Sequence, residues 1–236
     1  NRGIYDTNID LTITCQTPGA EIRYTMNGTT PSETNGFIYS NPIPIYKTTI
    51  IRAAAFKPGW KPSNTDTHTY IYISDVTRQT NPGFPSTYPT TWGGPVADYA
   101  MDLRVVTNAA YKNTITNDLK SLPVVCITVN PDEFFGPQGI YANPSWSGVA
   151  SERPGAMEMF YPDGSKDDFG VNCGVRIAGG ASRTGTPKKG LRVVFRDKYG
   201  PGKLKYKFFD DSELDRFDAI QFRPIYNMSW VRTDNS

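Results

Sequence analysis

Basic residues surround a glycine-rich segment in the C-terminal half of the chain, and this segment could bind an anion. Two adjacent glycines let backbone N–H groups converge on a negative charge, while arginine and lysine side chains contact phosphate oxygens. The predicted phosphate-binding residues are Arg176, Gly179, Gly180, Ser182, Arg183, Lys188 and Lys189. The alternative is a glycine-rich β-turn with solvated basic residues on both sides, because no G-x-x-x-x-G-K-[ST] string of a Walker loop occurs.

The sequence offers few groups for acid–base or nucleophilic chemistry. His68 is the one histidine, so a Ser–His–Asp or Cys–His arrangement would have to use it. It alternates with Asp66 and Tyr70 in a strand-like run, which favours a surface strand residue. Acidic residues at 167–168 and between 210 and 218 are typical of solvated turns, with a calcium loop as the alternative for the second run. We therefore name no catalytic residue and predict no metal site.

The three cysteines, Cys15, Cys126 and Cys173, show no C-x-x-C spacing, which argues against a zinc site. A disulfide between Cys126 and Cys173 requires that their two strands be neighbours. The alternative is that the cysteines are small apolar side chains, and the lack of a partner for Cys15 favours it.

Aromatic side chains offer a second kind of binding surface, because rings stack on the apolar faces of sugars. Tyr46 and Trp60 are the predicted carbohydrate-binding residues. Trp92, Tyr141 and Trp146 are further candidates for such a platform. The alternative is that these rings serve core and rim packing in a chain short of aliphatic residues.

The composition narrows the function classes. The 236 residues carry a formal net charge of +2 with acidic and basic residues interspersed, which argues against a nucleic-acid partner. No apolar run approaches the ~20 residues that cross a bilayer, so we predict no membrane span. The chain starts at Asn1 without a signal-type segment, and we expect a mature product or a fragment of an exported protein.

Alternating apolar and polar residues predict a mainly β fold, because 21 glycines and 19 prolines interrupt helices repeatedly. The expected strands are 9–15, 21–26, 48–56, 65–73, 124–129, 155–161, 169–178, 190–196 and 217–223. The one stretch with expected helical turns is 97–121, for example at 114–120. Short strands with many turns indicate a small β-sandwich, followed by a second, mostly antiparallel β domain.

Residues 75–118 differ in composition from both flanking regions. Residues 80–95 are rich in Pro, Gly and Thr, which is typical of a linker. The large rings of Phe84, Tyr88 and Trp92 favour a connector that is docked on a domain surface. We therefore predict a first module at 1–74, a connector at 75–118 and a second module at 119–236.

Four motifs follow one another between residues 18 and 64. They are a G-A-x-I-x-Y-T strand, an N-G-x-x-P turn, a P-I-x-I segment and an R-A-x-A-x-K-x-G-x-x-P-S ending. Together they resemble the chitobiase/β-hexosaminidase C-terminal type of domain. The resemblance implies an Ig-like β-sandwich that serves as an accessory module in large secreted bacterial proteins.

A second set of strings lies between residues 119 and 230, including LKSLPVVCITVN, ERPGAMEMFYPDG, GVRIAGGASRTGTPKKGLRVVFRDKYGPGKL and FDAIQFRPIYNMSW. They resemble the beginning of a CotH-like domain, named after a spore-coat protein family of atypical protein kinases. The chain departs from this pattern in one loop. Kinase-type members have a Gly-Asn-Ser-Ser-like loop where this chain has Gly179-Gly180-Ala181-Ser182-Arg183.

The two resemblances imply the N-terminal portion of an exported, multidomain bacterial protein at an extracellular or cell-surface location. The second domain is then incomplete, and the intact parent would transfer phosphate from ATP, with Mg²⁺, to a protein hydroxyl. This chain alone is expected to bind neither cofactor and to be inactive. The alternative is a non-enzymatic scaffold or carbohydrate-binding protein. Expected partners are the rest of its own polypeptide and an extracellular or cell-surface polysaccharide or protein.

Overall fold

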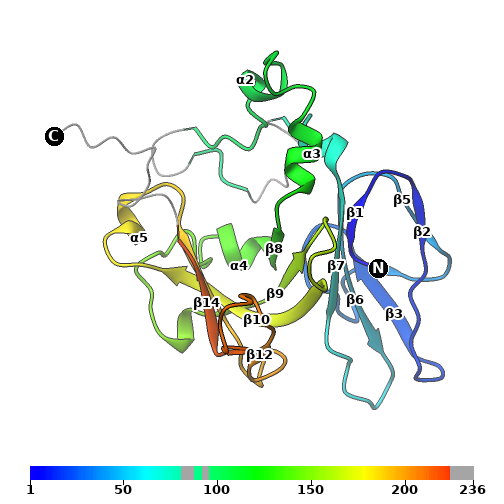
Figure 1. The fold of residues 1–236 in the computed structure, drawn as a ribbon. Coiled ribbons are helices and arrows are strands. Elements are labelled where there is room, and N and C mark those ends of the chain that lie inside the picture. Colours follow the sequence, from blue (N-terminus) through cyan, green and yellow to red (C-terminus); the bar gives the residue numbers. More distant parts are fainter. Residues whose placement is uncertain (81–87, 92–95, 224–236) are drawn as a thin grey trace. The chain divides into compact units, whose positions relative to one another are not determined.

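The computed structural model of the chain describes residues 1–80, 88–91 and 96–223. Its regular structure is mainly β, with antiparallel sheets and short helices, which confirms the predicted fold class (Figure 1). The strands are β1 (Gly3–Tyr5), β2 (Ile9–Leu11), β3 (Glu21–Thr25), β4 (Phe37–Ile38), β5 (Ile43–Ile45), β6 (Thr49–Phe56), β7 (Asp66–Tyr72), β8 (Val124–Val129), β9 (Arg153–Phe160), β10 (Phe169–Ala178), β11 (Gly190–Val194), β12 (Leu204–Lys205), β13 (Arg216–Phe217) and β14 (Ala219–Phe222). The helices are α1 (Ile73–Val76), α2 (Leu103–Val106), α3 (Ile115–Lys120), α4 (Pro131–Phe135), the 3-10 helix η1 (Val149–Ser151) and α5 (Ser182–Gly185).

The described residues form two compact units, and neither unit is continuous in sequence. Unit 1 takes the described residues of the ranges 1–85, 98–128 and 156–170. Unit 2 takes those of the ranges 86–97, 129–155 and 171–236. Each unit therefore combines residues from before and after position 119, where the sequence predicts that the second module begins. The predicted module boundaries remain predictions.

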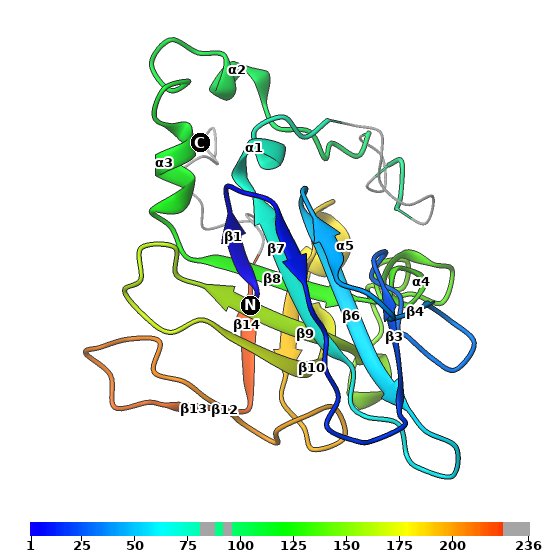
Figure 2. The same ribbon diagram turned by 90° about the vertical axis from the view of Figure 1, so that its right-hand side faces the viewer.

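Unit 1 contains a β-sandwich. One sheet has the strand order β1-β7-β6-β3-β4, and β2 pairs with β5 in a separate two-stranded sheet. Strands β3, β6 and β7 are antiparallel neighbours, whereas β1 joins β7 in parallel, with Gly3 beside Tyr70 (Figure 2). Side chains of both sheets meet in one core. Its buried members are Ile43, Ile45, Ile51, Tyr70 and Tyr72.

Strand β7 buries side chains on both of its faces, because side chains alternate along a strand. Tyr70 and Tyr72 point into the sandwich core. Ile71 and the following Ile73 belong to a second cluster of unit 1, together with Phe160. The run of residues 70–73 is apolar throughout for this reason, as expected for a strand covered on both sides.

A buried carboxylate is bound to the middle of β7. Glu158, on β9, is 1% exposed, and it accepts hydrogen bonds from the Thr69 backbone N–H at 2.9 Å and the Thr69 hydroxyl at 2.5 Å. Nη1 of Arg2 lies 3.5 Å from this carboxylate. Burial raises the pKa of Glu158, while the hydrogen bonds from Thr69 and the charge of Arg2 oppose the rise. Nη2 of Arg2 also lies 2.9 Å from Nε2 of His68, so the one histidine is a half-buried member of this network.

Unit 2 is organised around the pairing of β10, β11 and β14, in which β11 lies between the other two strands. Strand β11 is antiparallel to both of its neighbours. Val175 and Val193 are fully buried on one face of β10 and β11. Arg176 and Arg192 therefore lie on the opposite face, since successive side chains alternate.

Several strands end where backbone pairing ends and not where the alternation ends. The alternation of residues 9–15 predicts one strand, but β2 ends at Leu11. The run 217–223 is divided between β13 and β14. By contrast, β8 and β10 have the predicted bounds, and α3 lies within the predicted helical turns at 114–120.

The structure has all three cysteines as free thiols. Cys173 is buried and Cys126 is partly buried. Burial raises the pKa of each of these two thiols to about 12, and the charge of Glu158 adds to the rise at Cys126. Cys15 is exposed.

The structure describes only one of the three aromatic residues that the sequence analysis names in the connector, Tyr88. Tyr88 lies on Phe135, with ring centroids 4.7 Å apart, and both residues belong to unit 2. Phe84 and Trp92 lie outside the described residues.

The Arg2–Glu158 pair makes unit 1 sensitive to pH. In Arg2→Met we expect the free energy of unfolding to fall by about 3 kcal/mol at pH 7, because a buried carboxylate loses its cation. The raised pKa means that folded Glu158 takes up a proton at a higher pH than unfolded Glu158, so charged Glu158 opposes folding at neutral pH. The loss caused by Arg2→Met should therefore shrink as the pH falls towards 4.

Urea unfolding at pH 7 and at pH 4 measures this difference. Arg23→Met is the matched control, since Arg23 pairs with the exposed Glu21, and it should cost less than about 1 kcal/mol at either pH. If Arg2→Met lowered the free energy of unfolding equally at both pH values, the charge of Glu158 could not be the cause of the loss.

Candidate anion-binding site

Two arginines face each other across the hairpin of β10 and β11. Arg176 is the direct antiparallel partner of Arg192, and Arg192 is in turn the partner of Gln221 on β14. Directly opposed residues of an antiparallel pair have Cβ atoms about 5 Å apart. The register therefore places two guanidinium groups and one amide in a row across three strands, on the face opposite to Val175 and Val193.

Neither arginine of this pair is neutralised within the part of the chain that the structure describes. The side chains of Arg176 and Arg192 make no hydrogen bond or ion pair with residues 1–80, 88–91 or 96–223. Like charges that face each other across a sheet destabilise it, by an amount on the order of 0.2–1 kcal/mol. An anion between the two guanidinium groups would turn this repulsion into attraction.

A third arginine approaches the same place but is held by a buried acid. Arg196 binds the Glu152 carboxylate through Nη2 at 2.9 Å and Nε at 3.0 Å. The Glu152 side chain is fully buried, and it also accepts a hydrogen bond from the Tyr199 hydroxyl at 3.2 Å and lies 3.6 Å from Nζ of Lys198. Burial alone would raise the pKa of Glu152, but the hydrogen bonds and charge of Arg196, with Tyr199 and Lys198, lower it.

The loop after β11 folds back over the arginine face because two glycines leave room for it. A Cβ atom on Gly174 would lie 2.3 Å from the Tyr199 ring, so the ring packs directly on the β10 backbone at this glycine. A Cβ on Gly200 would lie 2.8 Å from the Asn172 carbonyl oxygen. The loop is therefore fixed at two points on β10 in addition to its bonds with Glu152.

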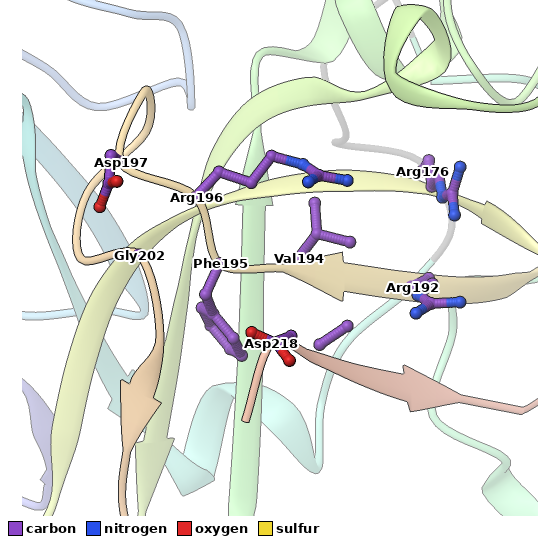
Figure 3. Close-up of a pocket in the computed structure, with 9 residues that line it drawn as sticks. Arg176, Arg192, Val194, Phe195, Arg196, Asp197, Gly202 and Asp218 are labelled. Carbon is purple, nitrogen blue, oxygen red and sulfur yellow. The ribbon is translucent and has the colours of Figure 1, made fainter. Parts of the chain in front are cut away.

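The folded loop and the arginine row enclose a hollow of about 440 Å³ (Figure 3). Arg176 and Arg192 lie at one end of it in Figure 3, and Asp197 and Gly202 lie at the other. The lining residues are Arg176, Arg192, Val194, Phe195, Arg196, Asp197, Gly202, Asp218 and Ala219. The arrangement can bind an anion between two arginine forks, in the geometry that suits phosphate and carboxylate oxygens.

The structure separates Arg176 from the rest of the predicted phosphate-binding segment. The hollow extends from Arg176 towards 194–202, away from the turn that joins β10 to β11. None of the other predicted residues lines it. Within the turn, Arg183 donates hydrogen bonds to the carbonyl oxygens of Gly179 at 2.8 Å and Trp146 at 3.1 Å. Its guanidinium therefore supports the turn.

The remaining residues of the segment also serve the turn. Lys189 donates to the Thr186 carbonyl at 2.7 Å, and burial lowers the pKa of its ammonium group. Gly179 has a φ of +124°, and a Cβ there would lie 2.3 Å from the Ser182 hydroxyl. Gly180 and Lys188 are exposed. The glycines thus permit the turn, and the structure shows no convergence of these residues on one point.

The predicted carbohydrate-binding residues lie apart. Tyr46 precedes β6 and Trp60 follows it, and the 8 residues of β6 extend over about 25 Å. Both rings are exposed, at 61% and 64%. Trp60 has the Lys57 ammonium 5.0 Å from its ring centre. The two rings therefore do not form one platform.

Sequence reasoning missed Arg192, Arg196 and Glu152. The sequence of residues 190–196 carries a signal for Arg192, because this polar position falls between the apolar residues Leu191 and Val193. The signal cannot say which residue of β10 lies opposite, since the long intervening turn leaves the register open. The residues next to Glu152 in the sequence do not distinguish it from an acidic residue on the surface.

Two further findings concern metals and membranes. Within residues 1–80, 88–91 and 96–223, no three His, Cys, Asp or Glu side chains are grouped so that they could hold a metal ion. In the same residues no helix has the length and apolar character needed to cross a bilayer.

Glu152→Gln should weaken unit 2 in a pH-dependent way. Glu152 has a lowered pKa in the folded chain, so its contribution is present above the unfolded value of about 4.3 and is lost as the pH falls through the folded value. We expect Glu152→Gln to lower the free energy of unfolding by about 2 kcal/mol at pH 7, and this loss should be smaller at pH 3, below the unfolded value.

Denaturant unfolding at both pH values tests this expectation. Asp215→Asn is the control, because Asp215 and Arg216 form an exposed pair whose loss should cost less than about 0.5 kcal/mol. A loss for Glu152→Gln that is unchanged at pH 3 would show that the charge of Glu152 is unimportant.

Comparison with known families concerns the first part of the chain. Residues 11–70 match the family model described as Fn3 associated. No match was found among curated proteins or among solved structures. The matched residues contain β3 to β6, most of β7 and the last residue of β2, which belong to the sandwich described above. Residues 11–70 thus form a fibronectin-III-associated, Ig-like domain.

Proposed function

We propose that this chain is a phosphate-binding β protein in which Arg176 and Arg192 hold the anion. The observation that carries the proposal is their register, which sets two guanidinium groups directly opposite each other at one end of a hollow. Such a pair is unfavourable by itself and becomes favourable when a bound anion lies between the charges. A surface without a ligand has no need of this arrangement.

The chemistry of the pair favours a multivalent oxyanion. Each guanidinium presents a rigid fork of N–H donors, and two forks on directly opposed residues can bind different oxygens of one phosphate group. Arg196 lies beside them, with its position fixed by Glu152. A carboxylate has only two oxygens and would satisfy one fork, so we expect phosphate to bind better.

The wider setting of the proposal is a CotH-like, kinase-related protein with a chitobiase-type accessory domain, exported by a bacterium. In that setting the anion would belong to ATP, and phosphate would pass to a protein hydroxyl in the intact parent. The motif strings quoted above support this setting, and Arg176 and Arg192 both lie in one of them. The described residues do not offer a carboxylate cluster that fits Mg²⁺, so we assign no step to the metal.

Titration calorimetry with inorganic phosphate tests the proposal. We expect binding in the millimolar range that weakens with added salt, because the contacts are charged. Arg192→Gln should weaken it about tenfold, and Arg176→Gln with Arg192→Gln should abolish it. Neither change should lower the melting temperature, since each removes a like-charge contact.

Lys188→Gln is the matched control, because Lys188 is an exposed cation of the same region that does not line the hollow. It should leave phosphate binding unchanged. Binding that resists the double arginine change, or that Lys188→Gln abolishes, would overturn the assignment of the site.

A further inference from the structure

Two acidic groups line the hollow away from the arginine pair. Asp197 lies on the loop that follows β11, at the far end, and Asp218 directly precedes β14, between the two ends (Figure 3). Asp218 forms an ion pair with Lys203 at 2.8 Å. Asp197 has no hydrogen bond or ion pair with any residue in the described part of the chain. The charge left at this end is therefore the carboxylate of Asp197.

Gly202 leaves the space that the Asp197 carboxylate occupies. A Cβ atom on Gly202 would lie 2.4 Å from Oδ1 of Asp197, closer than real Cβ atoms come to any neighbour. The carboxylate therefore lies directly against the backbone of Gly202, and a side chain at this position would displace it. Gly202 is needed here for its lack of a side chain and not for an unusual backbone angle, because its φ is not positive.

The hollow is thus charged oppositely at its two ends. The ion pairs of Arg196 with Glu152 and of Lys203 with Asp218 neutralise the other charged groups of the wall. What remains is the pair of Arg176 and Arg192 at one end and Asp197 at the other. Asp197 lies five positions after Arg192 in the chain, so their backbones are at most about 17 Å apart, and the long arginine side chains shorten the gap.

The hollow also offers more room than an anion needs. At about 440 Å³ it falls in the size range of pockets that hold whole small molecules. A phosphate group between the arginines would fill only one end. The rest of the hollow would then accommodate a part of the ligand that reaches Asp197.

We infer that the ligand of this site is zwitterionic, with a phosphate group bound by Arg176 and Arg192 and an ammonium group bound by Asp197. The inference rests on the proposed function and adds the second half of the ligand. An ammonium group adds a charge attraction to the carboxylate that a neutral hydroxyl lacks, so the unpaired carboxylate selects the amine. The same carboxylate repels ligands whose far end is anionic.

Matched pairs of soluble probes test the inference. The aminoalkyl phosphates with two, four and six carbons carry both charges, and ethyl, butyl and hexyl phosphate lack only the amine. In calorimetry we expect the amine to improve the dissociation constant by about fivefold at the chain length that spans the hollow, with a smaller gain at the others.

Two variants distinguish the role of Asp197 from a general effect of charge. Asp197→Asn keeps the shape of the side chain and should abolish the gain from the amine, while it leaves alkyl phosphate binding unchanged or slightly tighter. Gly202→Ala keeps the charge but displaces the carboxylate, and it should also reduce the gain. Asp218→Asn is the control and should preserve most of it, because Lys203 already neutralises Asp218.

The possible results separate the two proposals. If neither phosphate nor any alkyl phosphate binds, the proposed function itself is wrong. If alkyl and aminoalkyl phosphates bind equally, phosphate binding stands and the zwitterionic ligand is rejected. A gain from the amine that persists in Asp197→Asn also rejects it, since another group would then hold the ammonium. Melting curves of each variant confirm that it is folded.

Discussion

The buried carboxylate of Glu152 is the contact on which the candidate site depends. A charged group without water needs several partners, and Glu152 finds all of them on one short loop: Arg196, Lys198 and Tyr199. These bonds hold the loop over the face of β10 and β11. Without them the hollow would lack one wall, and Arg176 and Arg192 would be two solvated side chains on an open sheet. Glu152 therefore acts through the loop, and touches no ligand itself.

Unit 1 also buries a carboxylate, with a different electrostatic result. Glu158 has one arginine, Arg2, at 3.5 Å, and its closer contacts come from the uncharged Thr69. Burial dominates, and its pKa is raised. Glu152 has two cations and a phenol, and its pKa is lowered. The number of charged partners thus decides which protonation state favours folding, although both side chains are almost fully hidden from solvent.

The strands could be predicted from the sequence more completely than the site. Period-two alternation marks β8 and β10 with their true bounds, because it reflects which face is buried. It identifies Arg176 as an outward residue but cannot supply its partner, since register depends on contacts far apart in the chain. The glycine-rich turn has the composition of an anion site. However, its Arg183 and Lys189 bind backbone carbonyls, and sequence does not show which acceptors a long side chain will reach.

Unit 1 is discontinuous, and this has a consequence for the order of events during synthesis. The sandwich strands end at Tyr72, but Phe160 and Glu158, which cover the second face of β7, come more than 80 residues later. At about 5–20 residues per second, a ribosome needs roughly 4–17 s to make them. During that interval the Thr69 backbone N–H of the nascent chain lacks its native acceptor, and Ile71 and Ile73 lack the part of their cover that Phe160 supplies. The matched Ig-like domain therefore emerges early but can complete its burial only late in translation, and a chaperone would have its best opportunity to bind β7 in between.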